Sequence, residues 1–179
     1  MSDNTASTTP IPKVYIILDT NILQYLNNTD ISKELIAYFS EIIKAGYTNF
    51  AMSDFSFFEA ISGAPKKDEE KLIELLSQIP RFEVKPETCV AAGQMATLYR
   101  IEKAEFQNIE SGDKIIAATA ILSGSLILTA NCNDFPRPFF REFHKRFVYY
   151  KRKNKDQMIS IYLLQPDLEQ INFRFNNRK

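Results

Sequence analysis

The sequence predicts an α/β domain with a largely parallel central sheet. Three observations predict it. Short, almost wholly apolar runs alternate with segments of helical period along most of the 179 residues, which is typical of strand–helix–strand units. The runs are rich in β-branched residues, as strands buried on both faces are. Near the C-terminus two such runs are separated only by a polar stretch, which predicts a β-hairpin added to the main sheet.

The elements can be placed in chain order. The apolar runs predict strands over residues 13–18, 49–53, 82–84 and 126–129. The segments of helical period predict helices over residues 32–45, from Ser53 or Asp54 to Gly63, and over 68–79, 87–106 and 113–122, the last one capped at Ser111. The C-terminal hairpin is predicted from strands at 147–150 and 158–164, joined by the sequence KRKNKDQ.

The length suits one domain of ordinary size, which we place over residues 13–175, with a basic C-terminal extension over 136–175. Residues 1–12 are polar and small and predict a disordered tail, without the basic start and apolar run of a signal peptide. No stretch approaches the roughly 20 apolar residues that a membrane-spanning helix requires. We therefore expect a cytoplasmic protein with no membrane contact.

Charge is balanced overall but unevenly distributed. The chain has 22 basic and 22 acidic residues, which excludes a protein coated with basic charge. Residues 141–155 contain seven Lys or Arg and one Glu, leaving 15 basic and 21 acidic residues elsewhere. This asymmetry suits a polyanion-binding surface beside an acidic pocket. The basic side chains that we expect to contact such a polyanion are Lys114, Arg137, Arg141, Lys145, Arg146, Lys151, Arg152 and Lys153.

Aromatic residues accompany this basic segment. Phe139, Phe140, Tyr149 and Tyr150 are candidates for stacking on single-stranded bases. The alternative is a solvated hairpin turn whose aromatic residues belong to the core, since runs of charge are usually just solvated.

Four acidic residues occupy positions that bring them to one edge of the sheet. Asp19 ends the first strand, Asp134 follows a later strand by a short loop, and Asp113 lies in the first turn of a helix. Glu59 lies on the helix after the second strand. In open α/β sheets the carboxyl ends of the strands are where ligands bind. Each residue taken singly has a structural alternative, because Asp at a helix start is a common cap.

Carboxylates held close together raise one another's pKa unless a cation lies between them. Their oxygens suit the hard cations Mg²⁺ or Mn²⁺. Such a cluster, with few His or Cys, indicates phosphate chemistry, in which the metal neutralises the scissile phosphate and activates water. We therefore expect a divalent-metal site formed by Asp19, Glu59, Asp113 and Asp134.

These motifs resemble the PIN-domain family, which includes the VapC-like toxin ribonucleases. The chain has ILDTNIL around Asp19, MSDFSFFEA with Ser53 and Glu59, and DKIIAATAIL from Asp113 followed by LILT. The loop after that strand contains Thr129, Asn131, Asp134 and Phe135. The resemblance runs from about residue 14 to 135. It implies a three-layer α/β/α sandwich and a metal-dependent endoribonuclease that hydrolyses RNA phosphodiester bonds.

The resemblance also implies roles for single residues. Asp19, Glu59 and Asp113 carry the metal, and Asp134 completes the site. The residues with supporting roles are Thr20, Asn21, Ser53, Thr129 and Asn131. Many small members are toxins silenced by a bound antitoxin, so a cognate antitoxin is the protein partner that the resemblance suggests, and it allows a homodimer.

The chain departs from the family pattern at two positions of the site. Asn131 stands where many relatives have an acid, and Lys114 follows Asp113 where relatives often have a small or apolar residue. A different class of function therefore stays open, namely a PIN fold without useful activity that binds RNA or protein. A phosphatase with Asp19 as nucleophile is a further alternative, but Asn21 occupies the place of the second Asp that such families use.

Overall fold

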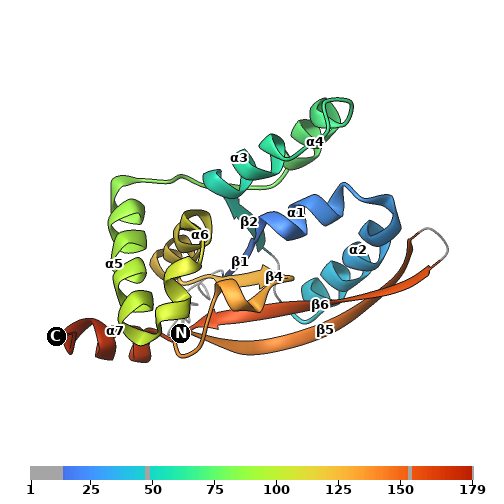
Figure 1. The fold of residues 1–179 in the computed structure, drawn as a ribbon. Helices are drawn as coiled ribbons and strands as arrows, with labels where there is room; N and C mark the ends of the chain where they lie inside the picture. The colour runs from blue at the N-terminus through green and yellow to red at the C-terminus, as the bar shows by residue number, and fades with distance from the viewer. Residues whose placement is uncertain (1–13, 47–48, 153–154, 179) are drawn as a thin grey trace, which may run out of the picture.

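The computed structural model describes residues 14–46, 49–152 and 155–178, so the predicted tail over residues 1–12 lies outside the described residues. Within them the chain forms a six-stranded sheet in the order β3-β2-β1-β4-β6-β5 (Figure 1). The strands are β1 Tyr15–Leu18, β2 Asn49–Ser53, β3 Arg81–Phe82, β4 Leu126–Thr129, β5 Phe140–Arg152 and β6 Lys155–Pro166.

Helices connect and cover the strands. The α-helices are α1 Thr20–Leu26, α2 Thr29–Lys44, α3 Asp54–Ser62, α4 Glu69–Leu76, α5 Pro86–Glu102, α6 Ser111–Ser123 and α7 Leu168–Asn176. Two short 3₁₀ helices are η1 Ala104–Asn108 and η2 Cys132–Asp134. No helix in the described part of the chain is both long and apolar enough to cross a membrane.

The core of the sheet is parallel, as predicted. Strand β1 pairs in parallel with both β2 and β4, and β3 joins β2 in parallel. Strand β6 runs antiparallel to β4, and β5 antiparallel to β6. The carboxyl ends of β1, β2 and β4 therefore meet at one edge of the sheet.

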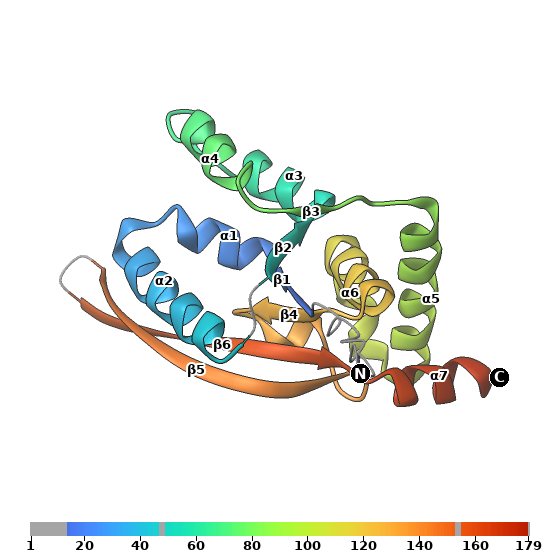
Figure 2. The same ribbon diagram turned by 180° about the vertical axis from the view of Figure 1, so that it is seen from behind.

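Helices cover both faces of this sheet, which gives the expected three layers. Strand residues alternate between the faces. Ile16 and Leu18 belong to a core cluster that contains residues of α1, α2, α3 and α4, whereas Ile17 belongs to a second cluster with α5, α6 and α7. Figure 2 shows α5 and α6 on one side of the strands and α1 and α2 on the other.

Several boundaries differ from the prediction. Helix α1 was not predicted, because its seven residues are too few for a visible helical period. The helix predicted over 87–106 ends at Glu102, and η1 follows it. Ser111 was predicted to cap α6, but it is the first residue of that helix, and Glu110 is the N-cap.

The C-terminal hairpin is longer than predicted. Its strands reach from Phe140 to Arg152 and from Lys155 to Pro166, so charged residues assigned to the loop KRKNKDQ belong to the strands. Strand β5 lies at the edge of the sheet, where charged side chains are common because they oppose pairing with other chains.

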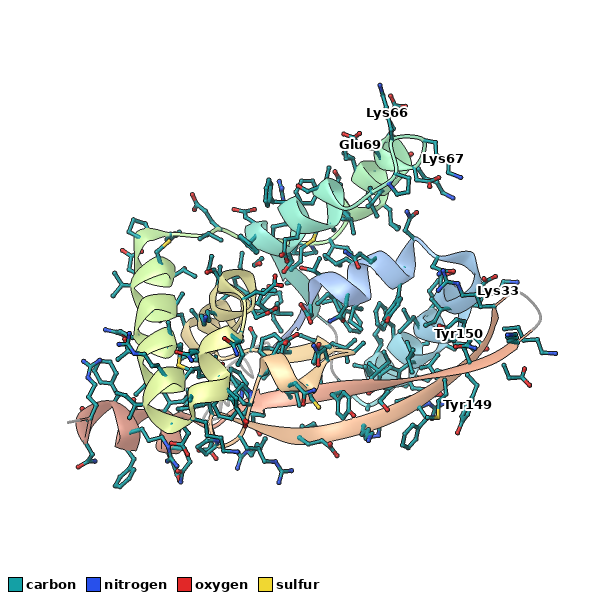
Figure 3. All side chains as sticks on the ribbon, in the orientation of Figure 1. Lys33, Lys66, Lys67, Glu69, Tyr149 and Tyr150 are labelled. Carbon is teal, nitrogen blue, oxygen red and sulfur yellow. The ribbon has the colours of Figure 1, made fainter. Side chains whose placement is uncertain are left out.

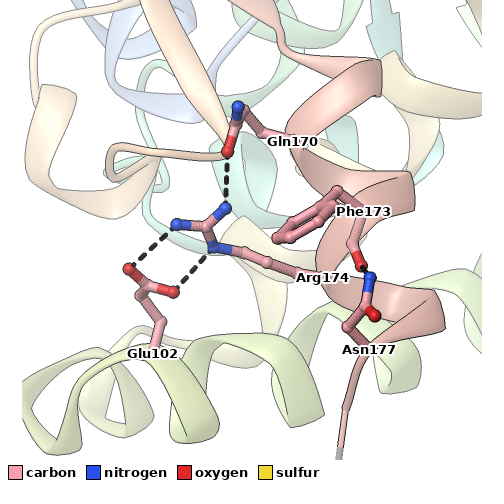
Figure 4. A network of polar contacts seen from close by, with 5 residues as sticks. All are labelled: Glu102, Gln170, Phe173, Arg174 and Asn177. Carbon is pink, nitrogen blue, oxygen red and sulfur yellow. Dashed lines mark hydrogen bonds and ion pairs between the residues drawn. The ribbon is translucent and has the colours of Figure 1, made fainter.

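Helix α7 was also not predicted, and it packs against α5. Its Arg174 donates from Nε to Glu102 Oε2 at 2.7 Å and from Nη1 to Gln170 Oε1 at 2.5 Å (Figure 4). Both partners of the ion pair are partly shielded from solvent. The contact fixes the end of the chain on the face opposite to α1 and α2.

Candidate active site

Asp19 lies at the carboxyl end of β1, buried and densely hydrogen-bonded. One carboxylate oxygen accepts from the backbone N–H of Thr20 at 2.7 Å, so Asp19 is the N-cap of α1. The other accepts from Asn21 Nδ2 at 2.5 Å and from Thr129 Oγ1 at 2.6 Å. The helix-cap and active-site interpretations of Asp19 are therefore compatible, because the bonds that cap α1 also hold the carboxylate in place.

The supporting polar residues join the ends of β1 and β4. Asn21 Oδ1 accepts from the backbone N–H of Ala130 at 2.9 Å. Thr129 Oγ1 accepts from the backbone N–H of Asn131 at 2.9 Å while it donates to Asp19. The bonds from Thr129 to Asp19 and from Ala130 to Asn21 cross between the two strand ends, so both β1 and β4 hold the Asp19 carboxylate in position.

Glu59 reaches the same edge from α3. Ser53 ends β2 and caps α3 by accepting from the backbone N–H of Ser56 at 2.9 Å, which sets the start of the helix. Glu59 then lies on the second turn, and its Oε2 accepts from Thr20 Oγ1 at 2.6 Å. Thr20 thereby links the carboxylate of Glu59 to the residue next to Asp19.

Helix α6 approaches α3 closely at a glycine. A Cβ atom at Gly112 would stand 2.3 Å from Phe55 Cε1 and 3.1 Å from Glu59 Oε1. The absence of a side chain at Gly112 therefore lets the first turn of α6 come up to Glu59, and it places Asp113 beside the other acids.

Asp134 comes from the loop after β4. Asn131 caps η2 and donates from Nδ2 to Asp134 Oδ2 at 2.7 Å. The residue that stands where relatives often have an acid thus orients the fourth carboxylate by a hydrogen bond.

Charge interactions connect Asp113 with the other three predicted carboxylates. Burial raises the pKa of Asp113 to about 8, and the charges of Asp134, Asp19, Glu59 and Glu110 add to this rise. Burial raises the pKa of Asp19 to about 6 against the opposing effect of its hydrogen bonds, and Asp134 contributes to the rise. The pKa of Asp134 is also raised, mainly by burial. Strongly raised carboxyl pKa values of this kind are typical of functional sites.

Tyr99 was missed by the sequence analysis. It lies on α5, is fully buried, and its hydroxyl has no hydrogen-bond partner among the described residues. Burial raises the pKa of Tyr99, and the nearby charges of Asp113 and Asp134 raise it further. The hydroxyl therefore keeps its proton, close enough to Asp113 and Asp134 to be affected by their charges. No motif marks this residue, because an aromatic residue in a buried helix is ordinarily part of the core.

The donor set fits a hard divalent cation. It consists of carboxylate oxygens, which Mg²⁺ and Mn²⁺ prefer, and its members repel each other without a cation between them. Among the described residues no three His, Cys, Asp or Glu side chains stand close enough together to hold one ion. Mg²⁺ usually binds through one or two carboxylates and keeps several waters, so a pair from this cluster is sufficient.

A cavity of about 650 Å³ opens next to Asp134. It lies between η1, η2 and the start of β5, and Lys103 and Arg137 are among the charged residues that line it. Glu105 and Glu142 also line it, so the space next to Asp134 has charges of both signs at its wall.

The expected RNA-contacting residues do not form one surface. Lys114 Nζ donates to the backbone carbonyl of Ile109, which ties the loop before α6. Arg141 donates to Gln165, and Arg146 forms an ion pair with Glu41 of α2 at 3.1 Å.

The remaining basic residues lie at the cavity and along the hairpin. Arg137 is exposed at the cavity wall, and Lys145, Lys151 and Arg152 are exposed on β5. Lys153 lies outside the described residues. The stacking prediction was wrong for Phe139 and Phe140, which are 0% and 2% exposed because they belong to the core under α5 and α7.

The chain is similar to known proteins. A family model for the PIN domain matches residues 16–138. A solved toxin–antitoxin complex from Klebsiella pneumoniae is 23% identical, over 70% of this chain and 92% of that one, with a TM-score of 0.48. The structure of VapBC2 from Rickettsia felis bound to a DNA fragment from their promoter is 21% identical, over 68% of this chain and 91% of that one, with a TM-score of 0.52. No curated protein matches the chain.

The chain belongs to the PIN-domain family, since the family model spans well over half of its 179 residues. The resemblance seen in the motifs is thereby confirmed, and so is the mixed α/β fold, which the Rickettsia felis structure shares. PIN domains are generally nucleases, and typically use divalent metals.

Proposed function

We propose that this protein is a divalent-metal-dependent endoribonuclease that hydrolyses RNA phosphodiester bonds at the cluster of Asp19, Glu59, Asp113 and Asp134. The observation that carries the proposal is the charge interaction of Asp113 on α6 with Asp19, Glu59 and Asp134, which come from the end of β1, from α3 and from η2 and raise the pKa of Asp113. Membership of a nuclease family supports the same chemistry.

The residues of the chain have separate tasks in this proposal. Asp19 and Asp113 hold the cation, with Glu59 and Asp134 completing its surroundings directly or through water. A bound Mg²⁺ or Mn²⁺ supplies charge neutralisation at the scissile phosphate and lowers the pKa of water. Thr20 and Thr129 keep the carboxylates of Glu59 and Asp19 in place through their hydroxyl groups.

Protonation decides when the site can work. With the pKa of Asp113 raised to about 8, this carboxyl holds a proton at neutral pH until a cation displaces it. Cation binding therefore releases protons, as metal binding to carboxylates generally does. Activity should increase with pH as Asp113 loses its proton.

The cavity beside Asp134 is the proposed entry for the RNA backbone next to the cluster. Arg137 at its wall provides a cation for a phosphate. Of the other basic residues expected at the RNA, Lys145, Lys151 and Arg152 remain proposed contacts, with Arg141 and Arg146 secondary because each already has a protein partner.

We also propose the biological setting that the resemblance implies, a toxin silenced by a cognate antitoxin in the cytoplasm. The solved VapBC2 structure from Rickettsia felis, whose fold this chain shares, supports such a partner. Expression of the protein alone should then arrest the growth of a host cell, and the Asp19→Asn variant should not. A homodimer is the proposed state of the free protein, to be checked by sedimentation.

Cleavage of a mixed pool of structured and single-stranded RNAs tests the proposed activity. The assay is run with Mg²⁺, with Mn²⁺ and with chelator, using wild type and the Asp19→Asn/Asp113→Asn double variant. Glu69→Gln, at the remote end of the α3–α4 pair in Figure 3, is a matched control that removes a carboxylate elsewhere. Metal-dependent cleavage lost only in the double variant supports the proposal. RNA binding without cleavage in any condition favours the binding-module alternative.

A further inference from the structure

The β5–β6 hairpin extends past the edge of the sheet at which the acids lie. Strand β6 pairs with β4 only from Ile127 opposite Leu164 to Thr129 opposite Tyr162. The seven residues of β6 from Lys155 to Ile161 continue beyond the end of β4, which corresponds to about 20 Å of strand. We call residues 144–152 and 155–162 the hairpin arm. It projects on the active-site side because β6 runs antiparallel to β4.

One face of the hairpin arm is covered by α2. Val148 and Ile161 are buried there in the same cluster as Tyr38 of α2. Figure 3 shows Tyr150 on this side, close to α2, and Tyr149 on the opposite face of the arm.

The face of the arm turned away from α2 is open and exposes several large apolar side chains. Helices α5, α6 and α7 gather at the other end of β5 and β6 (Figure 1). Phe147, Tyr149 and Met158 are 46%, 66% and 53% exposed. Three large apolar side chains so accessible on one short surface indicate a binding site, because scattered single exposures are normal but grouped ones are not.

This face is continuous with the acidic cluster. Directly opposed residues of antiparallel strands project to the same face. Thr129, which donates to Asp19, is opposite Tyr162, and Tyr162 is opposite Lys145. The next two pairs that project to this face are Phe147 with Ser160 and Tyr149 with Met158. A row of side chains therefore runs from the cluster to the outer part of the arm.

The row combines aromatic rings with a cation. Lys145 Nζ lies 4.9 Å from the ring centroid of Phe147 and 4.9 Å from that of Tyr162. It forms no ion pair with any described residue, and the same holds for Lys151, a second lysine on this face. Asp156, the one acidic residue in the described part of the arm, is opposite Lys151 and projects to the same face. The surface is thus aromatic, with a small excess of positive charge.

Aromatic rings with nearby ammonium groups bind single-stranded nucleic acid, because every base has a face that can stack and every nucleotide carries a phosphate. Alternate residues of a strand are about 7 Å apart, which is about twice the 3.4 Å spacing of nucleotides in a duplex strand. Phe147 and Tyr149 therefore suit unstacked bases. A partner protein would have to cover the lysines as well, so the charge favours a polyanion.

We propose that the open face of the hairpin arm is a stacking platform for single-stranded RNA, formed by Lys145, Phe147, Tyr149, Met158 and Tyr162. It holds the strand on one side of the scissile bond while the acidic cluster takes the phosphate. Its assignment as a substrate platform rests on the proposed ribonuclease function, but the binding itself does not require cleavage.

Fluorescence anisotropy of the full chain with a labelled single-stranded RNA 12-mer, in chelator, tests the platform. The Phe147→Ala and Tyr149→Ala variants should each weaken binding about fivefold or more, since base–ring stacking contributes that much per base. Tyr149→Phe should bind as wild type does, because the ring is retained. The control Phe173→Ala removes an equally exposed aromatic residue, 63% exposed, from α7 and should not change the affinity.

The outcomes separate the platform from the nuclease. Weakened binding in the alanine variants, repeated in an Asp113→Asn background, supports the platform even if no RNA is ever cut. Cleavage by wild type with equal affinity for RNA in all variants would overturn the platform and leave the nuclease intact. The platform would also be overturned if the wild type did not bind the 12-mer. The same holds if the alanine variants kept their affinity for RNA but sedimented as monomers where the wild type is a dimer.

Discussion

Replacement of Asp113 by Asn should change how the stability of the metal-free protein depends on pH. The usual pKa of the carboxyl is 3.8, and in the folded protein it is about 8. Between these values the folded state binds the proton more tightly than the unfolded state. The protonated Asp113 carboxyl therefore stabilises the folded state fully below pH 3.8, and this stabilisation is lost progressively as the pH rises to about 8. Asn carries no charge at any pH, so the variant should lack this loss.

The size of the effect follows from the pKa. At 1.36 kcal/mol per pKa unit, the rise corresponds to an upper bound of about 6 kcal/mol. Asp113 is partly exposed, and solvent screens the repulsion, so about 2 kcal/mol is the working figure. For a chain of this size that corresponds to about 4–8 °C in Tm.

Thermal unfolding by circular dichroism in chelator, at pH 5 and pH 9, measures this difference. About 70% of the working figure is lost between pH 5 and pH 9, since part of the stabilisation is already lost between pH 3.8 and pH 5. The Tm of Asp113→Asn minus that of wild type should therefore be more positive at pH 9 than at pH 5 by about 3–6 °C. The difference between Glu69→Gln and wild type should not change. An equal Tm difference at both pH values would refute the argument that Asp113 is held among other carboxylates.

Three further predictions concern the same region. Tyr99→Phe removes a buried hydroxyl that has no described hydrogen-bond partner. The free energy of unfolding in urea should therefore be higher than that of wild type or at most about 1 kcal/mol lower. A loss of several kcal/mol would show that the hydroxyl forms a hydrogen bond. Gly112→Ala places a Cβ 2.3 Å from Phe55, so it should cost about 1–3 kcal/mol in the same assay, and an unchanged midpoint would contradict the close approach. The Mg²⁺-induced rise in Tm should grow from pH 6 to pH 8, as Asp19 and then Asp113 lose their protons, whereas a rise independent of pH would exclude them as ligands.

Much of the parallel core could be predicted because its signals are local. Strand β4 is an apolar run of four buried residues, and the sequence alone placed both of its ends. The sequence limited the cap of α3 to Ser53 or Asp54, and the structure assigns it to Ser53, whose hydroxyl accepts from the backbone N–H of Ser56. Local motifs also placed Asp19 at the end of β1.

The rest depends on contacts between distant segments. Helix α1 is short and is fixed by its cap on Asp19 and by packing on α3, so no periodicity announces it. The need for Gly112 arises from Phe55 on another helix. The length of β5 was underestimated because an edge strand with one open face carries charged residues that resemble a loop.

Calorimetric titration with Mn²⁺ at pH 8, comparing wild type with the Asp19→Asn/Asp113→Asn double variant, tests the central claim most directly. We expect saturable binding with proton release in wild type, and no binding in the double variant while that variant stays folded. Equal binding by the two proteins, or no binding by the wild type, would contradict the assignment of the acidic cluster as a metal centre.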